Sequence, residues 1–89
     1  MKIRDNFLLR EVAGNRIVVP VGEAADRFHG MLKLNETGAY LWHLLESPTD
    51  EAALMAAMLR DYDIDQETAQ RDLQTFLNTL RKAGLLEEE

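Results

Sequence analysis

The sequence predicts an α+β fold in which a three-stranded antiparallel sheet precedes three helices. Short extended runs rich in strand-forming residues occupy the first third of the chain, and apolar residues at helical spacing follow. Two breaks divide that helical part into three segments. With 89 residues, of which 46% are hydrophobic, the chain has the size of one domain, so we expect residues 1–89 to fold as a single unit.

The first two strands are expected at residues 7–12 and 16–20, joined as a β-hairpin. Ala13-Gly14-Asn15 supplies the turn between them. Pro20 ends the second strand because proline cannot donate to a ladder. Residues 21–28 are then expected to form a loop.

A third strand is expected at residues 29–34. Leu32 and Leu34 alternate there with Met31 and Lys33, so the two pairs point to opposite faces. The three strands together predict a sheet with one apolar face.

Each of the three expected helices follows a residue that favours helix capping. The caps are Asn35, Thr49 and Asp65, and the helices that they begin run to about residues 46, 61 and 83. In the third helix the predicted buried stripe consists of Ala69, Leu73, Phe76 and Leu80. Gly84 is a suitable C-cap, after which Leu85 and Leu86 can pack on the core. The order of elements is similar to a winged helix-turn-helix domain whose sheet comes first.

Composition excludes several classes of chemistry. The chain has no cysteine, so it has neither disulfides nor thiolate metal sites. His29 and His43 have no second ligand at a metal-binding spacing, and no catalytic triad, carboxylate pair or phosphate-binding loop can be recognised. We therefore expect no enzymatic activity, no metal and no cofactor. The charged N-terminus and the absence of a long apolar run predict a cytoplasmic protein without a membrane span.

Net charge argues against nucleic-acid binding. The formal charge is −6, and the first half of the third helix, which would enter a DNA groove, carries two acids and a single arginine. Residues 1–35 are mildly basic and residues 36–89 strongly acidic.

The third strand is a candidate binding element, because a sheet this small leaves at least one edge unpaired. Such an edge can accept a peptide as an additional strand. Helix 3 could supply side-chain anchors beside it, although periodicity alone also allows these residues to be ordinary core and surface. The predicted site comprises Gly30, Met31, Leu32, Lys33, Leu34, Gln70, Arg71, Gln74, Leu77, Asn78 and Arg81.

The chain also resembles the PqqD-like family, named after coenzyme PQQ synthesis protein D. The most specific segment is Leu34-Asn35-Glu36-Thr37-Gly38-Ala39, which leads into a helix containing Trp42. Further matching segments are Phe7-Leu-Leu-Arg-Glu-Val-Ala-Gly14, Ile17-Val-Val-Pro20, Tyr62-Asp63, Asp72-Leu-Gln-Thr-Phe-Leu-Asn-Thr-Leu80 and Gly84-Leu-Leu86.

The resemblance implies a recognition element for ribosomally synthesised, post-translationally modified peptides. A precursor's leader segment would add beside the third strand, at residues 30–34, and border the third helix. A partner, often a radical SAM enzyme, would perform the chemistry. Leader peptides of such systems are often acidic, which would suit Lys33, Arg71 and Arg81.

The sequence also allows two alternative functions. The chain could be a regulatory or scaffold protein that forms a homodimer, or docks on a protein, through the apolar second helix. An exposed stripe of Met55, Leu59 and Tyr62 would favour that function. DNA binding is the other alternative.

Overall fold

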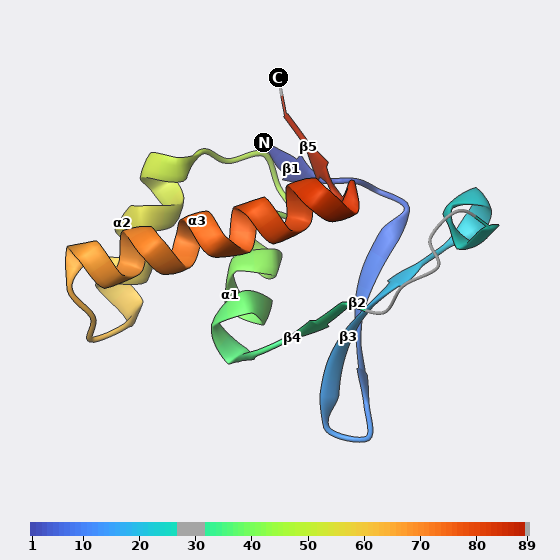
Figure 1. The fold of residues 1–89 in the computed structure, drawn as a ribbon, viewed down its shortest axis with the longest axis horizontal. Helices are drawn as coiled ribbons and strands as arrows, with labels where there is room; N and C mark the ends of the chain where they lie inside the picture. Colours follow the sequence, from blue (N-terminus) through green and yellow to red (C-terminus); the bar gives the residue numbers. More distant parts are fainter. Residues whose placement is uncertain (27–31, 89) are drawn as a thin grey trace.

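The computed structural model describes residues 1–26 and 32–88, and it confirms the expected α+β architecture. Figure 1 shows an N-terminal sheet followed by helices, with the long third helix crossing the other two. The strands are β1 (Lys2–Ile3), β2 (Phe7–Val12), β3 (Asn15–Pro20), β4 (Leu32–Leu34) and β5 (Leu86–Glu87). The helices are η1 (Gly22–Asp26), α1 (Glu36–Leu44), α2 (Glu51–Asp61) and α3 (Gln66–Ala83).

The larger sheet has the strand order β2-β3-β4, and both pairings are antiparallel. Ala13 and Gly14 form the hairpin turn with positive φ values of 51° and 81°, so the turn is one residue shorter than expected and β3 begins at Asn15. In β4, Leu34 is buried and Lys33 exposed, as the alternation predicts. Residues 29–31 of the expected third strand lie outside the described residues.

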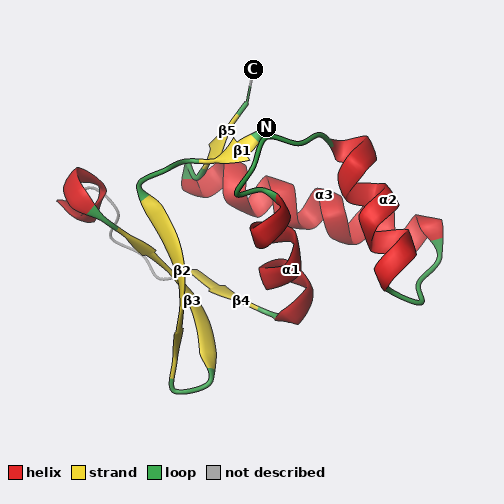
Figure 2. Cartoon of the chain, turned by 180° about the vertical axis from the view of Figure 1, so that it is seen from behind, coloured by secondary structure: helices red, strands yellow, loops and turns green. Residues whose placement is uncertain are grey.

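Two features of the fold were not expected. The segment predicted to be a loop contains the 3-10 helix η1, and a second sheet pairs β1 with β5. In that sheet Ile3 lies opposite Leu86, and the backbone N–H groups of Ile3 and Arg4 donate to Leu45 and Leu85 at 2.9 Å. This second sheet fixes both ends of the described chain against the core (Figure 2).

The helices begin and end where side-chain chemistry dictates. Asn35, Asp50 and Asp65 each accept a hydrogen bond from a backbone N–H in the first turn of the helix that follows. The cap of α2 is thus Asp50, one residue later than predicted. Gly84 adopts the left-handed conformation with φ of 73° and ends α3, as predicted.

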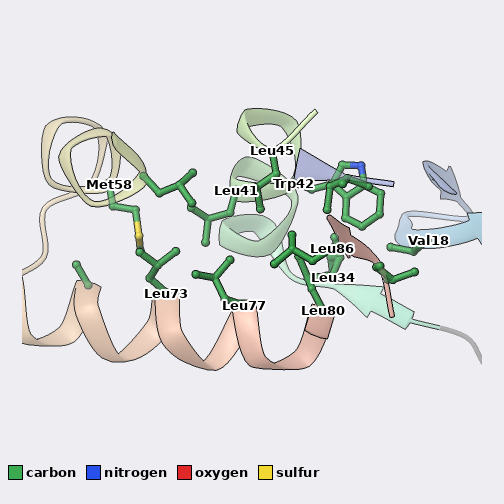
Figure 3. Packing of buried hydrophobic residues seen from close by; sticks show 14 residues of the cluster. Val18, Leu34, Leu41, Trp42, Leu45, Met58, Leu73, Leu77, Leu80 and Leu86 are labelled. Carbon is green, nitrogen blue, oxygen red and sulfur yellow. The ribbon is translucent and has the colours of Figure 1, made fainter. Parts of the chain in front are cut away.

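One hydrophobic cluster joins the sheets to the helices. Trp42 of α1 lies in it with 1% of its surface exposed, and the same cluster contains Val18 of β3 and the buried leucines of α3 (Figure 3). Leu85 and Leu86 also belong to the cluster, as expected. Within the described parts of the chain, no helix is long and apolar enough to cross a membrane.

Candidate functional site

An open groove of about 310 Å³ lies between β4 and α3. The start of α1 forms its floor. Its lining residues are Leu32, Lys33, Leu34, Asn35, Thr37, Gly38, Leu41, Asp72, Thr75, Phe76 and Thr79. The groove is therefore built from two consecutive elements, β4 and α1, and from α3, which lies far from them in the sequence.

The strand side of the groove is the edge of β4. Leu32, Lys33 and Leu34 are consecutive and alternate in side-chain direction, yet all three line the groove. Three successive residues can do so when their backbone borders it. Strand β4 pairs with β3 on one side, and no described strand pairs with its other side. The backbone groups on that side are thus available to a further strand.

Gly38 determines how closely α3 approaches the floor. A Cβ atom at this position would lie 3.3 Å from Cε1 of Phe76 and 3.4 Å from Cβ of Leu34. The absence of a side chain therefore allows the half-buried Phe76 ring to lie directly on α1. Asn35 completes this corner, because its side chain accepts a hydrogen bond of 2.7 Å from the Gly38 N–H.

The helix side of the groove has an apolar centre and a polar rim. Phe76 forms the centre, while Asp72, Thr75 and Thr79 are exposed around it. The Thr79 hydroxyl donates to the Thr75 carbonyl at 2.9 Å, which satisfies it within the helix. On the opposite side Lys33 is exposed, and no other residue of the described chain forms an ion pair with it. The groove can thus hold an extended chain with apolar side chains toward its floor and polar ones at its rim.

The predicted site residues fall into three groups. Leu32, Lys33 and Leu34 line the groove, whereas Gly30 and Met31 lie outside the described residues. The six residues predicted on α3 do not line it: these are Gln70, Arg71, Gln74, Leu77, Asn78 and Arg81. The structure thus brings the strand half of the predicted site to the groove and places the helix half on other faces of α3.

Three of these α3 side chains, those of Gln74, Asn78 and Arg81, hold hydrogen bonds or ion pairs within the protein, and a fourth is buried. Leu77 is fully buried in the core, so it cannot act as a surface anchor. The Gln74 amide donates to Glu51 of α2 at 3.1 Å. Arg81 forms an ion pair with Glu88 at 2.8 Å, and this hydrogen-bonded partner raises the pKa of its guanidinium.

Sequence reasoning missed the α3 residues that do line the groove, Asp72, Thr75, Phe76 and Thr79. The sequence pattern predicts Phe76 in the buried stripe and Leu77 in the groove. Phe76 and Leu77 both lie at helical spacing from Leu73, but Leu77 is buried more deeply than Phe76. Gly38 was the available signal, because a glycine in a buried stripe indicates that another element approaches the helix there.

Side chains that could bind a metal ion were sought in the described part of the chain. It contains no group of three or more His, Asp or Glu residues that could hold a metal ion. His43 is exposed and its ring nitrogen lies 2.8 Å from the Glu46 carboxylate, while His29 lies outside the described residues.

The alternative surface on α2 is only partly exposed. Leu59 is 40% exposed, but Met55 packs against the core. The Tyr62 ring is half-buried and meets Tyr40 edge to face at 5.1 Å between centroids. The exposed stripe that this alternative requires is therefore reduced mainly to Leu59.

The fold and the groove define a small α+β domain with an accessible strand edge, as found in proteins that bind extended peptides. The chain belongs to the family of coenzyme PQQ synthesis protein D (PqqD), whose sequence model matches residues 8–86. It is also similar to a solved structure described as "TbiB1 in Complex with the TbiA(beta) Leader Peptide", with 26% identity and a TM-score of 0.77. That similarity covers 100% of this chain and 98% of the other. No curated protein matches the chain.

Proposed function

We propose that this chain binds the leader segment of a ribosomally synthesised precursor peptide and presents it to a modifying enzyme. The observation that carries the proposal is the accessible edge of β4 beside the groove formed with α3. Membership of the PqqD family and similarity to a structure solved with a leader peptide support it.

The leader would add to β4 as a further strand. Each backbone hydrogen bond contributes about 0.5–1.5 kcal/mol, so the short edge alone gives weak binding. Burial of an apolar leader side chain against Phe76 and Leu41 would supply the remainder, at about 25 cal/mol per Å² of apolar surface removed from water. The groove thus provides both register and affinity.

In this proposal the chain itself is not a catalyst. It acts in the cytoplasm by raising the local concentration of the precursor at the enzyme and by fixing its orientation. The partner that performs the chemistry is proposed to be a radical SAM enzyme, which carries its own clusters. Nucleic acid is not a ligand, because the overall charge of −6 opposes binding to phosphates.

The test is an amide NMR titration of the labelled chain with the leader segment of a precursor encoded beside its gene. Binding should shift the amide signals of β4 and of residues 72–79. Thr79→Trp, which fills the groove, should weaken binding about ten-fold or more, because it blocks the space beside the strand edge. Asn78→Trp is the matched control, since Asn78 is exposed on the same helix but does not line the groove.

The two variants also separate the two faces of α3. If Asn78→Trp abolished binding and Thr79→Trp did not, the peptide would lie on the face predicted from the sequence. Shifts confined to α2 would instead favour a docking or dimerising scaffold. Absence of any shift at saturating peptide would contradict leader binding.

A further inference from the structure

The face of the β2-β3-β4 sheet that points away from the helices is a second candidate binding surface. Cross-strand partners share a face, and Phe7, Leu9, Val18, Leu32 and Leu34 lie on the core side. Alternation places the intervening residues on the opposite side, here called the outer face. The outer face comprises Leu8, Arg10, Val12, Asn15, Ile17, Val19 and Lys33.

The outer face is more apolar than an exposed sheet face usually is. A sheet with one face on the core normally presents polar residues on the other. Here four of the seven residues are apolar, and Leu8 and Val12 are 38% and 54% exposed. Figures 1 and 2 show that the β2-β3 hairpin projects beyond the helices. Contiguous apolar surface in such a place is typical of a contact with another molecule.

The charges on this face indicate the chemistry of the partner. Arg10, Ile17 and Lys33 form one row across the three strands, so two cations flank an apolar residue. The outer face has no acidic residue, and within the described chain neither cation forms an ion pair. This pattern complements an apolar surface edged with carboxylates.

A second copy of the chain fits this surface poorly. A twofold contact would place the outer face of one copy on that of another, which brings the cations of both copies together. The formal charge of −6 on each copy adds further repulsion. A different protein is therefore the better partner.

Lys33 connects the outer face to the groove. The strand register places its side chain on the outer face, and Lys33 is also one of the residues that line the groove. A peptide added at the edge of β4 would continue the pleat of the sheet, and every second peptide side chain would project beside Lys33. Peptide binding would therefore enlarge the outer face with residues of the peptide.

We infer that the outer face is the docking surface for the modifying enzyme, a partner with an apolar patch edged by carboxylates. This inference rests on the proposed function above. The enzyme contacts Leu8 and Val12 together with side chains of the added leader strand. Because the enzyme contacts both the outer face and the leader, it binds the peptide-loaded chain more tightly than the empty chain. The chain in turn binds the leader more tightly when the enzyme is present.

The test uses calorimetric titrations with the modifying enzyme and the leader segment encoded beside the gene for this chain. Leu8→Glu and Val12→Glu should each weaken binding to the enzyme about ten-fold or more. Leu59→Glu, at a similarly exposed leucine of α2, is the matched control and should have no effect. Saturating leader should tighten enzyme binding to the unmodified chain at least about five-fold.

Leader affinity is measured separately for each variant, which distinguishes this inference from the proposed function. It should be unchanged in all three variants, because none of these positions lines the groove. Wild-type enzyme affinity in both outer-face variants would overturn the docking surface, as would a loss confined to Leu59→Glu. Failure of the unmodified chain to bind the leader would overturn the proposed function instead.

Three further measurements serve as controls. Circular dichroism should show the same fold in each variant, and Arg10→Glu should also weaken enzyme binding while leaving the apolar residues in place. Sedimentation of the free chain should show a monomer. A dimer that Leu8→Glu dissociates would identify a second copy as the occupant and overturn the inference.

Discussion

At the scale of single residues, Gly38 links the fold to the groove. Alanine normally stabilises a helix interior by about 1 kcal/mol relative to glycine. At this position, however, a methyl group would lie 3.1 Å from Asn35 Oδ1 and 3.3 Å from Phe76 Cε1. Crowding of this kind costs about 1–3 kcal/mol, and it also disturbs the cap of α1.

We therefore expect Gly38→Ala to lower the free energy of unfolding by about 1 kcal/mol, despite the better helix propensity. Chemical denaturation measures this directly. The control is Phe76→Leu alone and combined with Gly38→Ala, because the smaller side chain relieves the contact. A Gly38→Ala variant as stable as the parent would show that Phe76 moves freely away from α1.

The second residue-scale prediction concerns Asp61, whose pKa is lowered from 3.8 to about 2. The Arg60 guanidinium, bonded to it at 2.9 Å, is the main cause of this lowered pKa, and the Tyr40 hydroxyl is the second. Since the pKa in the folded state lies below its ordinary value, the charged carboxylate stabilises the fold at neutral pH. This contribution is lost as the pH falls from about 4 toward 2.

Carboxyl carbon NMR titrations should show the pKa of Asp61 rising toward its ordinary value in Arg60→Gln. The rise should be smaller in Tyr40→Phe. The Asp65 pKa is the internal control, because it is lowered by the Thr68 backbone instead and should not change. A larger effect of Tyr40→Phe would mean that the hydroxyl, rather than the guanidinium, dominates.

At the scale of elements, Gly84 connects α3 to β5. It has a φ of 73°, and a Cβ atom at this position would meet no other atom within 4 Å. Any effect of substitution therefore comes from the backbone alone. We expect Gly84→Ala to reduce the free energy of unfolding by about 1 kcal/mol, and Gly84→Asn to reduce it less, because asparagine tolerates the left-handed conformation better. Equal losses in thermal unfolding would point to a cause other than φ.

The elements that could be predicted from the sequence are those with a local signal. The hairpin, β4 and the three helices each carry alternation, turn residues or caps. The pairing of β1 with β5 carries none, because two-residue strands from opposite ends of the chain show no periodicity. It depends instead on burial of Ile3 and Leu86 in the common core.

Of the two halves of the candidate site, only one could be predicted from a local sequence signal. The strand half follows from alternation in β4, which is local. The helix half depends on the rotation of α3 about its axis, and Phe76 and Leu77 are equally spaced for the core on the sequence alone. Packing against α1 decides between them, and Gly38 determines that packing. Thr75 and Thr79 then face the groove in place of Gln74 and Asn78.

At the scale of the whole molecule, the sheet and the helices share one hydrophobic cluster. Because of this shared core, we propose that residues 1–89 unfold as one unit. Trp42 is the single tryptophan and is buried in the cluster that also contains Val18 of β3 and the leucines of α3. Its fluorescence therefore reports on contact between the two halves, whereas circular dichroism at 222 nm reports on the helices. For a single cooperative domain both signals should give the same thermal midpoint.

Val18→Ala extends this test to the sheet side of the cluster. Val18 is 1% exposed, so its truncation should cost about 2 kcal/mol and lower the midpoint by roughly 10 °C. Because the proposed unit is cooperative, the helical signal should move as far as the fluorescence signal although the substitution lies in β3. Val12→Ala, at an exposed position of the same hairpin, should leave both nearly unchanged. A fluorescence midpoint that falls while the helical midpoint stays would mean that the sheet unfolds separately from the helices.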